Sequence, residues 1–288
     1  MQKEFRQAIP DRIQGHPTRA VSYLSPNLFW FYEAIVAFLD RTFHLNIQIE
    51  QGKFDPLDDP QLYQNQWDFA FICGLPFARY LMRNKADLEW IAPDSLIAIA
   101  APVMQSDRYQ SSPIYFADVI VAVDSPYFSI SDLAGKTLCY NDRGSNSGYN
   151  LLRQRILEQG YPAPFFAQAI SSGFHQQSIR WVAEKLVDCA AIDSVVLEQE
   201  LRDFPELQQR LRVIDSIGAC PMPPIAVSQR FDTATIQQIQ AALLQPDTEL
   251  QIAMTKARIR CLAPVRSEDY TMLAVQYQAA VDAGYEFI

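Results

Sequence analysis

Asp124 to Gly148 read DSPYFSISDLAGKTLCYNDRGSNSG, and this stretch decides the fold class of the chain. Its short apolar run Leu138–Tyr140 has strand character, and the polar residues that follow interrupt it. The periodic segment Tyr149–Gln159 begins directly after GSNSG, so the predicted order is strand, hydroxyl-rich turn and helix. A helix N-terminus carries unpaired backbone N–H groups and the positive end of the helix dipole. Hydroxyl and amide side chains placed there can therefore bind an anion without a formal positive charge.

Ser145, Asn146 and Ser147 are the strongest candidates for ligand binding in this stretch. A single serine at the start of a helix usually serves as an N-cap. Small polar residues throughout the interval between Gly144 and Gly148 exceed what capping requires. From the residues alone, capping and anion binding both remain open.

Several segments together resemble one known family, the phosphate/phosphite/phosphonate class of substrate-binding proteins of ABC transporters. The resemblance rests on ISDLAGKTL (130–138), GSNSGY (144–149), SGFH (172–175) and LVDCAAID (186–193), and it covers roughly residues 118–227. It implies a type II periplasmic-binding-protein fold, in which two α/β lobes are joined by two crossing strands. The ligand is then held in the cleft between the lobes, which close by a hinge motion. The resemblance also implies that Ser145, Asn146 and Ser147 bind phosphoryl-type oxygens and that His175 donates to the ligand.

Strand and helix patterns alternate along the chain, which is typical of an α/β protein with largely parallel sheets. The apolar runs Ser95–Met104 and Ile114–Val123 flank a polar stretch, where we expect the chain to cross between lobes. We expect lobe 1 to comprise residues 1–103 and 224–288, and lobe 2 to comprise residues 104–223. Other expected strands are 19–24, 45–50, 67–73, 136–140, 165–170, 189–192, 211–216 and 225–227. Expected helices are 27–43, 60–66, 77–83, 147–159, 175–184 and 195–202, with three more beginning near 233, 247 and 267.

Further candidates for ligand binding follow predicted strands, because the carboxyl ends of parallel strands face the ligand cleft of open α/β sheets. Each has a structural alternative: Tyr23 could belong to the core, Tyr115 could only pack the crossover, and Asp193 could cap a helix. Gly74 and Leu75 could present backbone N–H groups, and Asp193 could accept a hydrogen bond from a protonated ligand oxygen. The set is Tyr23, Ser25, Gly74, Leu75, Tyr115, His175 and Asp193.

Two positions bear on the ligand's chemistry. In aminoalkylphosphonate-binding members of the resembled family, carboxylates near the places of Val195 and Pro223 hold the ammonium group, which needs a charged or strongly accepting partner when buried. The chain has no carboxylate at either place. A compact oxyanion such as phosphate, phosphite or methylphosphonate, or another small organic ligand, is therefore favoured. The aromatic residues 29–32 leave room for an apolar moiety, although most should belong to the core.

The composition excludes several classes of function. A formal net charge of −9 argues against nucleic acid and against an anionic membrane surface as partners. No apolar run reaches the ~18–20 residues that a membrane helix needs. The five cysteines form no close-spaced pair, so we expect no metal site and no redox pair. We also expect no cofactor.

The N-terminal residues 1–20 contain no apolar secretory core, although members of the resembled family are normally exported. We therefore expect a periplasmic protein if a signal was removed before numbering, and a cytoplasmic protein otherwise.

The leading interpretation is a non-enzymatic, monomeric solute-binding component of an ABC uptake system that binds a small anion. Its partner would be the transporter permease if the chain is exported. One alternative is an enzyme on the same fold that acts on a small phosphorylated precursor, with Cys73 or Cys220 as the nucleophile and His175 as the base. Another is a cytoplasmic ligand-sensing module.

Overall fold

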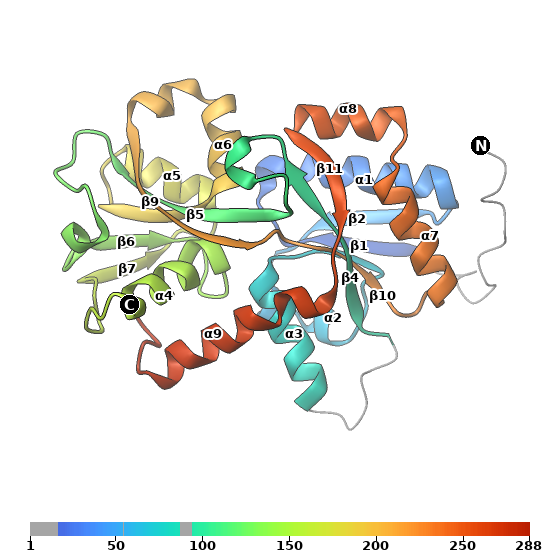
Figure 1. The fold of residues 1–288 in the computed structure, drawn as a ribbon, viewed down its shortest axis with the longest axis horizontal. Coiled ribbons are helices and arrows are strands. Elements are labelled where there is room, and N and C mark those ends of the chain that lie inside the picture. The colour runs from blue at the N-terminus through green and yellow to red at the C-terminus, as the bar shows by residue number, and fades with distance from the viewer. Residues whose placement is uncertain (1–16, 54, 87–93) are drawn as a thin grey trace.

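Two mixed β-sheets with helices packed around them make up the molecule (Figure 1). The computed structural model describes residues 17–53, 55–86 and 94–288. The sequence-based question of a signal segment falls mostly on residues 1–16, which lie outside the described residues. In the described part of the chain, every helix is too short or too polar to span a bilayer.

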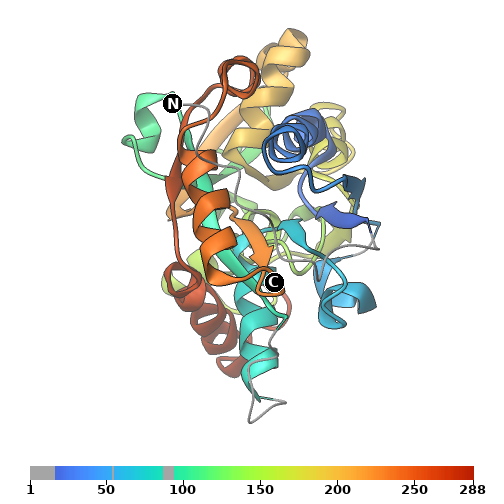
Figure 2. The same ribbon diagram turned by 90° about the vertical axis from the view of Figure 1, so that its right-hand side faces the viewer.

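The first sheet has six strands in the order β11-β4-β10-β3-β1-β2. Strand β1 pairs in parallel with β2 and with β3. Strand β10 pairs antiparallel with β3 and β4, and β11 pairs antiparallel with β4. These strands are β1 (Thr18–Ser22), β2 (Ile47–Gln51), β3 (Phe69–Phe71), β4 (Leu96–Met104), β10 (Ile225–Ser228) and β11 (Ile259–Pro264). The helices of this part are α1 (Phe29–Phe43), α2 (Pro60–Tyr63), α3 (Gly74–Ala86), α7 (Thr233–Leu244) and α8 (Thr248–Lys256). Helix α7 lies along β4 and β11 (Figure 2).

The second sheet has five strands in the order β7-β6-β8-β5-β9. Strand β6 pairs in parallel with β7 and β8, whereas β5 pairs antiparallel with β8 and β9. These strands are β5 (Ile114–Ala122), β6 (Thr137–Tyr140), β7 (Gln168–Ser171), β8 (Cys189–Asp193) and β9 (Leu211–Pro221), and the helices are α4 (Leu151–Glu158), α5 (His175–Ala183) and α6 (Ser194–Asp203).

The expectation of largely parallel sheets is therefore wrong in detail. The parallel pairs join β1 to β2 and β3, and β6 to β7 and β8, and they come from local β-α-β units at one edge of each sheet, as the alternation predicted. The antiparallel pairs involve β4, β5, β9 and β10, the strands that carry the chain from one sheet to the other and back.

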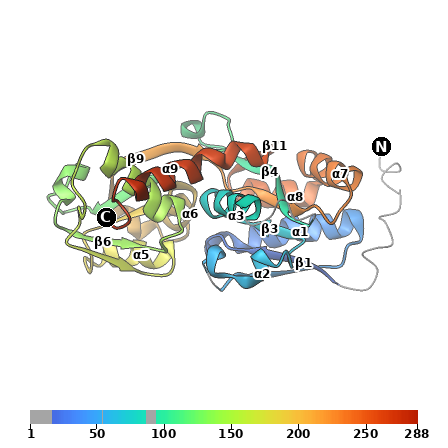
Figure 3. The same ribbon diagram turned by 90° about the horizontal axis from the view of Figure 1, so that it is seen from below.

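Two short segments connect the sheets. Residues 105–113 lead from β4 to β5, and residues 222–224 lead from β9 to β10. A third connection is made by packing: helix α9 (Thr271–Asp282) contacts both α3 and α4 (Figure 3). The C-terminal helix thus touches elements that belong to each of the two sheets.

Helix α1 shows how the apolar pattern builds the core. Phe31, Ile35 and Leu39 recur at helical spacing on one face and are 0–1% exposed. The helix ends at His44, which adopts the left-handed conformation at φ 55° and donates its N–H to the Asp40 carbonyl. Of the aromatic residues 29–32, Phe31 and Tyr32 are buried in the core and also line the cavity between the sheets, whereas Phe29 and Trp30 are half-buried.

Candidate ligand-binding site

A cavity of about 390 Å³ lies between the two sheets and their helices. Most of its polar residues come from the loops after β1 and β2 on one side and from the loops after β6, β7 and β8 on the other. Of the sequence-predicted candidates, those that line it are Tyr23, Ser25, Ser145, Ser147, His175 and Asp193. Asn146, Tyr115, Gly74 and Leu75 are not among the lining residues.

The GSNSG loop forms a tight helical start. Asn146–Asn150 make one π-helical turn that continues into α4, and the Ser145 hydroxyl accepts a hydrogen bond from the Gly148 N–H at 3.0 Å. Ser145 is thus an N-cap that also faces the cavity. Gly148 is required here, because a Cβ atom would lie 1.7 Å from Asn141 Oδ1 and 3.1 Å from His175 Cε1.

Asn146 supports the loop from behind the cavity. Its side-chain amide donates to the Tyr115 hydroxyl at 2.8 Å, and its backbone N–H faces the Cys73 thiol. Tyr115 is fully buried on β5. The pair therefore anchors the loop to the second sheet and does not form part of the cavity wall.

Ser147 and His175 form a hydrogen-bonded pair that lines the cavity. The Ser147 hydroxyl lies 3.1 Å from His175 Nε2, and His175 is 7% exposed. Burial lowers the pKa of His175 to about 4, so the imidazole is neutral at pH 7. Its Nδ1 has no hydrogen-bond partner among the described residues. A neutral imidazole has one donor and one acceptor nitrogen, so this pair can offer a hydrogen bond to a ligand oxygen.

The carboxyl group of Asp193 caps helix α6. It accepts hydrogen bonds from the Val195 and Val196 N–H groups at 2.8 and 3.4 Å, and burial raises its pKa to about 7. Asp193 thus caps a helix, as one of the two sequence-based alternatives predicted, and it also lines the cavity.

Two further carboxyl groups, which the sequence did not indicate, also line the cavity. Asp142 follows β6, and its carboxylate accepts a hydrogen bond from the Asn141 amide at 2.6 Å. Asp55, from the loop after β2, lies so close to this loop that its Oδ2 would be 2.6 Å from a Cβ atom at Gly144. Burial, reinforced by the Asp55 carboxylate, raises the pKa of Asp142 to about 7. Both residues follow a strand, β2 or β6, and this position at the carboxyl end of a strand could have indicated that they face the cavity.

These carboxyl groups change the inference drawn from Val195 and Pro223. Both residues line the cavity and are apolar, as the sequence indicated. Asp55 and Asp142 nevertheless supply acidic groups from other elements. The absence of carboxylates at the two positions therefore does not exclude an ammonium-bearing ligand.

The two sides of the cavity also contact each other directly. Ser25 donates to the side-chain oxygen of Gln176 on α5 at 2.9 Å, and Asn27 donates to Glu200 on α6 at 3.1 Å. Tyr23 donates to the Asp59 carboxylate at 2.5 Å, on its own side of the cavity. These contacts set the spacing between the first strand's loop and the second sheet's helices.

Gly74 and Leu75 open helix α3, and the structure does not bring them to the cavity wall. A Cβ atom at Gly74 would lie 2.9 Å from Leu273 Cδ1 near α9. Their neighbours Cys73 and Pro76 line the cavity instead.

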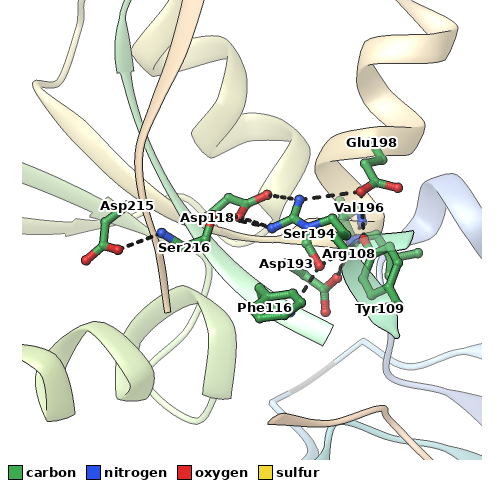
Figure 4. Close-up of polar contacts among 11 residues, drawn as sticks. Arg108, Tyr109, Phe116, Asp118, Asp193, Ser194, Val196, Glu198, Asp215 and Ser216 are labelled. Carbon is green, nitrogen blue, oxygen red and sulfur yellow. Dashed lines mark hydrogen bonds and ion pairs between the residues drawn. The ribbon is translucent and has the colours of Figure 1, made fainter. Parts of the chain in front are cut away.

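Arg108 and Tyr109, in the segment between β4 and β5, hold this segment by polar contacts to β5 and α6 (Figure 4). Its guanidinium binds the Asp118 carboxylate with both terminal nitrogens, at 3.0 and 2.7 Å. The adjacent Tyr109 donates to Glu198 at 2.7 Å, and Ser194 accepts the Phe116 N–H at 3.1 Å. The connecting segment is thereby tied to the first turns of α6, which follow Asp193.

The comparisons with known proteins agree with this arrangement. The family described as ABC transporter, phosphonate, periplasmic substrate-binding protein matches residues 59–270. The chain belongs to this family. Among curated proteins, no sequence matches.

Solved structures show the same fold. The binding protein component of an ABC phosphonate transporter from Pseudomonas aeruginosa has a TM-score of 0.77 at 15% identity, over 92% of this chain and 88% of that chain. PhnD1 from Prochlorococcus marinus, solved with methylphosphonate, has a TM-score of 0.76 at 13% identity, over 91% and 97%. The aliphatic sulphonate binding protein SsuA from Escherichia coli has a TM-score of 0.56 at 15% identity, over 94% and 88%. The predicted type II periplasmic-binding-protein fold is confirmed.

Proposed function

We propose that the chain is the solute-binding component of an ABC uptake system and that it binds a small phosphorus oxyanion between its lobes. The observation that carries this proposal is the Ser147–His175 pair, buried in the cavity of a chain that belongs to the phosphonate-binding family. A neutral hydroxyl–imidazole pair beside a helix N-terminus supplies hydrogen-bond donors to an anion without a counter-charge.

The proposed lobes are residues 1–103 with 224–288, and residues 104–223. The division is supported by the two sheets and by the two connecting segments, which fall at 105–113 and 222–224. In this arrangement Ser145, Ser147, His175 and Asp193 belong to lobe 2, and Tyr23 and Ser25 to lobe 1. Ligand would then contact both lobes and stabilise their closed arrangement.

The proposed setting is the periplasm, beside an ABC permease that receives the ligand. It is supported by the family description, which is that of a periplasmic component. A non-enzymatic role is supported by the state of the cysteines suggested as nucleophiles. Burial raises the pKa of Cys73 to about 12 and that of Cys220 to about 11, so both thiols stay protonated at neutral pH.

Isothermal titration calorimetry with phosphate, phosphite, methylphosphonate, 2-aminoethylphosphonate, sulfate and small carboxylates tests the proposal. We expect one phosphorus oxyanion to bind, and Ser147→Ala or His175→Ala to weaken it roughly 10- to 150-fold, the range for hydrogen bonds to charged groups. Ser131→Ala is the matched control, because Ser131 is exposed and does not line the cavity. Failure of every phosphorus oxyanion to bind would refute the proposed ligand class.

A further inference from the structure

The cavity has two chemically different parts. Its polar residues come mainly from the loops after β1, β2, β6, β7 and β8. The remaining wall is almost entirely apolar and comes from other elements. Its members used here, which we call the apolar limb, are Ile35 on α1, Met104 at the end of β4, Val196 on α6, Ala257 after α8 and Ile259 on β11.

The residues of the apolar limb come from neighbouring elements. Ile259 and Met104 are paired residues of adjacent strands. Helix α8, which ends just before Ala257, packs against both α1 and β11. Across from them, the Val196 carbonyl accepts a hydrogen bond from Asn27, just before α1, so the first turn of α6 closes the limb. The five side chains are between 0 and 6% exposed, so a group bound among them is shielded from bulk water.

The volume of the cavity exceeds what a compact oxyanion fills. At about 390 Å³ it could hold roughly a dozen water molecules. It falls within the range of about 300–1,000 Å³ that pockets for larger organic ligands occupy. Apolar walls hydrate poorly, so a ligand that leaves the limb empty forgoes the main favourable term that the site offers.

We propose that the ligand is an amphipathic anion, with its oxyanion head at Ser147 and His175 and an alkyl or aryl body in the apolar limb. This inference rests on the proposed function for the head group and adds the body. Burial of each methylene in an apolar site tightens binding roughly fourfold, until the limb is filled. Specificity then comes from the body as much as from the head.

Titration calorimetry with methyl-, butyl- and hexylphosphonate, together with hexanesulfonate and hexanoate, tests the inference on the full chain. We expect the dissociation constant to fall roughly fourfold per methylene from methyl- to hexylphosphonate. Ala257→Leu should abolish this gain, because its added side chain occupies the limb. Ser131→Ala, exposed and outside the cavity, is the control and should leave both the gain and methylphosphonate binding unchanged. Val196→Phe serves in its place if Ala257→Leu does not fold.

The outcomes separate the two proposals. Equal or weaker binding of the longer phosphonates overturns the apolar limb and leaves the phosphonate function standing. Binding of hexanesulfonate or hexanoate, but of no phosphonate, overturns the phosphorus specificity and supports the limb. Failure of all these ligands to bind overturns both.

Discussion

Replacing Arg108 with methionine isolates the contribution of the buried ion pair that holds the inter-sheet segment. Asp118 is 1% exposed, and its carboxylate receives two hydrogen bonds from Arg108 and one from Ser216 at 2.7 Å. After the substitution, the buried Asp118 carboxylate keeps the hydrogen bond from Ser216 and loses both hydrogen bonds from Arg108.

The structure sets the size of the effect. Removing one partner of a buried ion pair costs about 3–5 kcal/mol. The Arg108 side chain is 31% exposed, so water replaces part of the lost guanidinium, and we expect a loss below this range, about 2–3 kcal/mol. For a chain of 288 residues, that corresponds to a fall in Tm of roughly 3–5 °C.

Urea unfolding and thermal melts at pH 7 measure the loss. Arg41→Met is the matched control, because Arg41 also binds two carboxylates, at 3.0 and 3.2 Å, but is 40% exposed. An exposed pair should contribute at most about 1 kcal/mol. The double variant Arg108→Met/Asp118→Asn should recover most of the loss, since no unpaired charge remains buried. If Arg108→Met costs no more than Arg41→Met, the ion pair does not hold the segment and the reasoning is refuted.

Three further variants probe the loop, the carboxyl pair and the C-terminal helix. Gly148→Ala should weaken ligand binding at least tenfold by calorimetry, because the new Cβ would lie 1.7 Å from Asn141 Oδ1. Adding Asn141→Ala to this variant should partly restore binding, and unchanged binding in Gly148→Ala alone would contradict the close approach. The folded-state pKa of Asp142, about 7, exceeds the ordinary 3.8, so the folded state holds the extra proton and stability falls as pH rises from about 4 to about 7. Asp142→Asn removes this fall, and its Tm advantage over wild type should grow between pH 4 and pH 8, whereas a constant difference would refute the shift. Tyr277→Ala should lower the unfolding free energy in urea by about 1–3 kcal/mol, because its ring lies 4.1 and 4.5 Å from arginine guanidinium groups of α3 and α4. Tyr277→Phe keeps the ring and should lose clearly less, and an equal loss in both variants would exclude the stacking.

Local pattern determined much of the fold. The strand at Thr137–Tyr140, the polar turn and the helix that follows lie where the sequence placed them. The apolar runs before and after the first crossover became β4 and β5 with nearly the expected bounds. These features depend on hydrophobic period and on turn residues, which are written within a few positions of one another.

The hydrophobic pattern of the sequence could not predict which distant strands pair with each other. The antiparallel neighbours of β4 and β5 depend on which strands meet at a sheet edge, and periodicity carries no information about partners. For the same reason Gly74 was expected at the cavity, although α3 begins there and packs towards α9.

The sequence alone determined the family resemblance and the hydroxyl-rich helix start, because both rest on contiguous residues. Only the tertiary structure decided which of those groups face the cavity: Ser147 and His175 do, whereas Asn146 is turned towards Tyr115. It also brought Asp55 and Asp142 together and built the apolar limb from five elements. The physical reason is that side-chain direction and burial are set by packing between lobes, which no local stretch of the chain encodes.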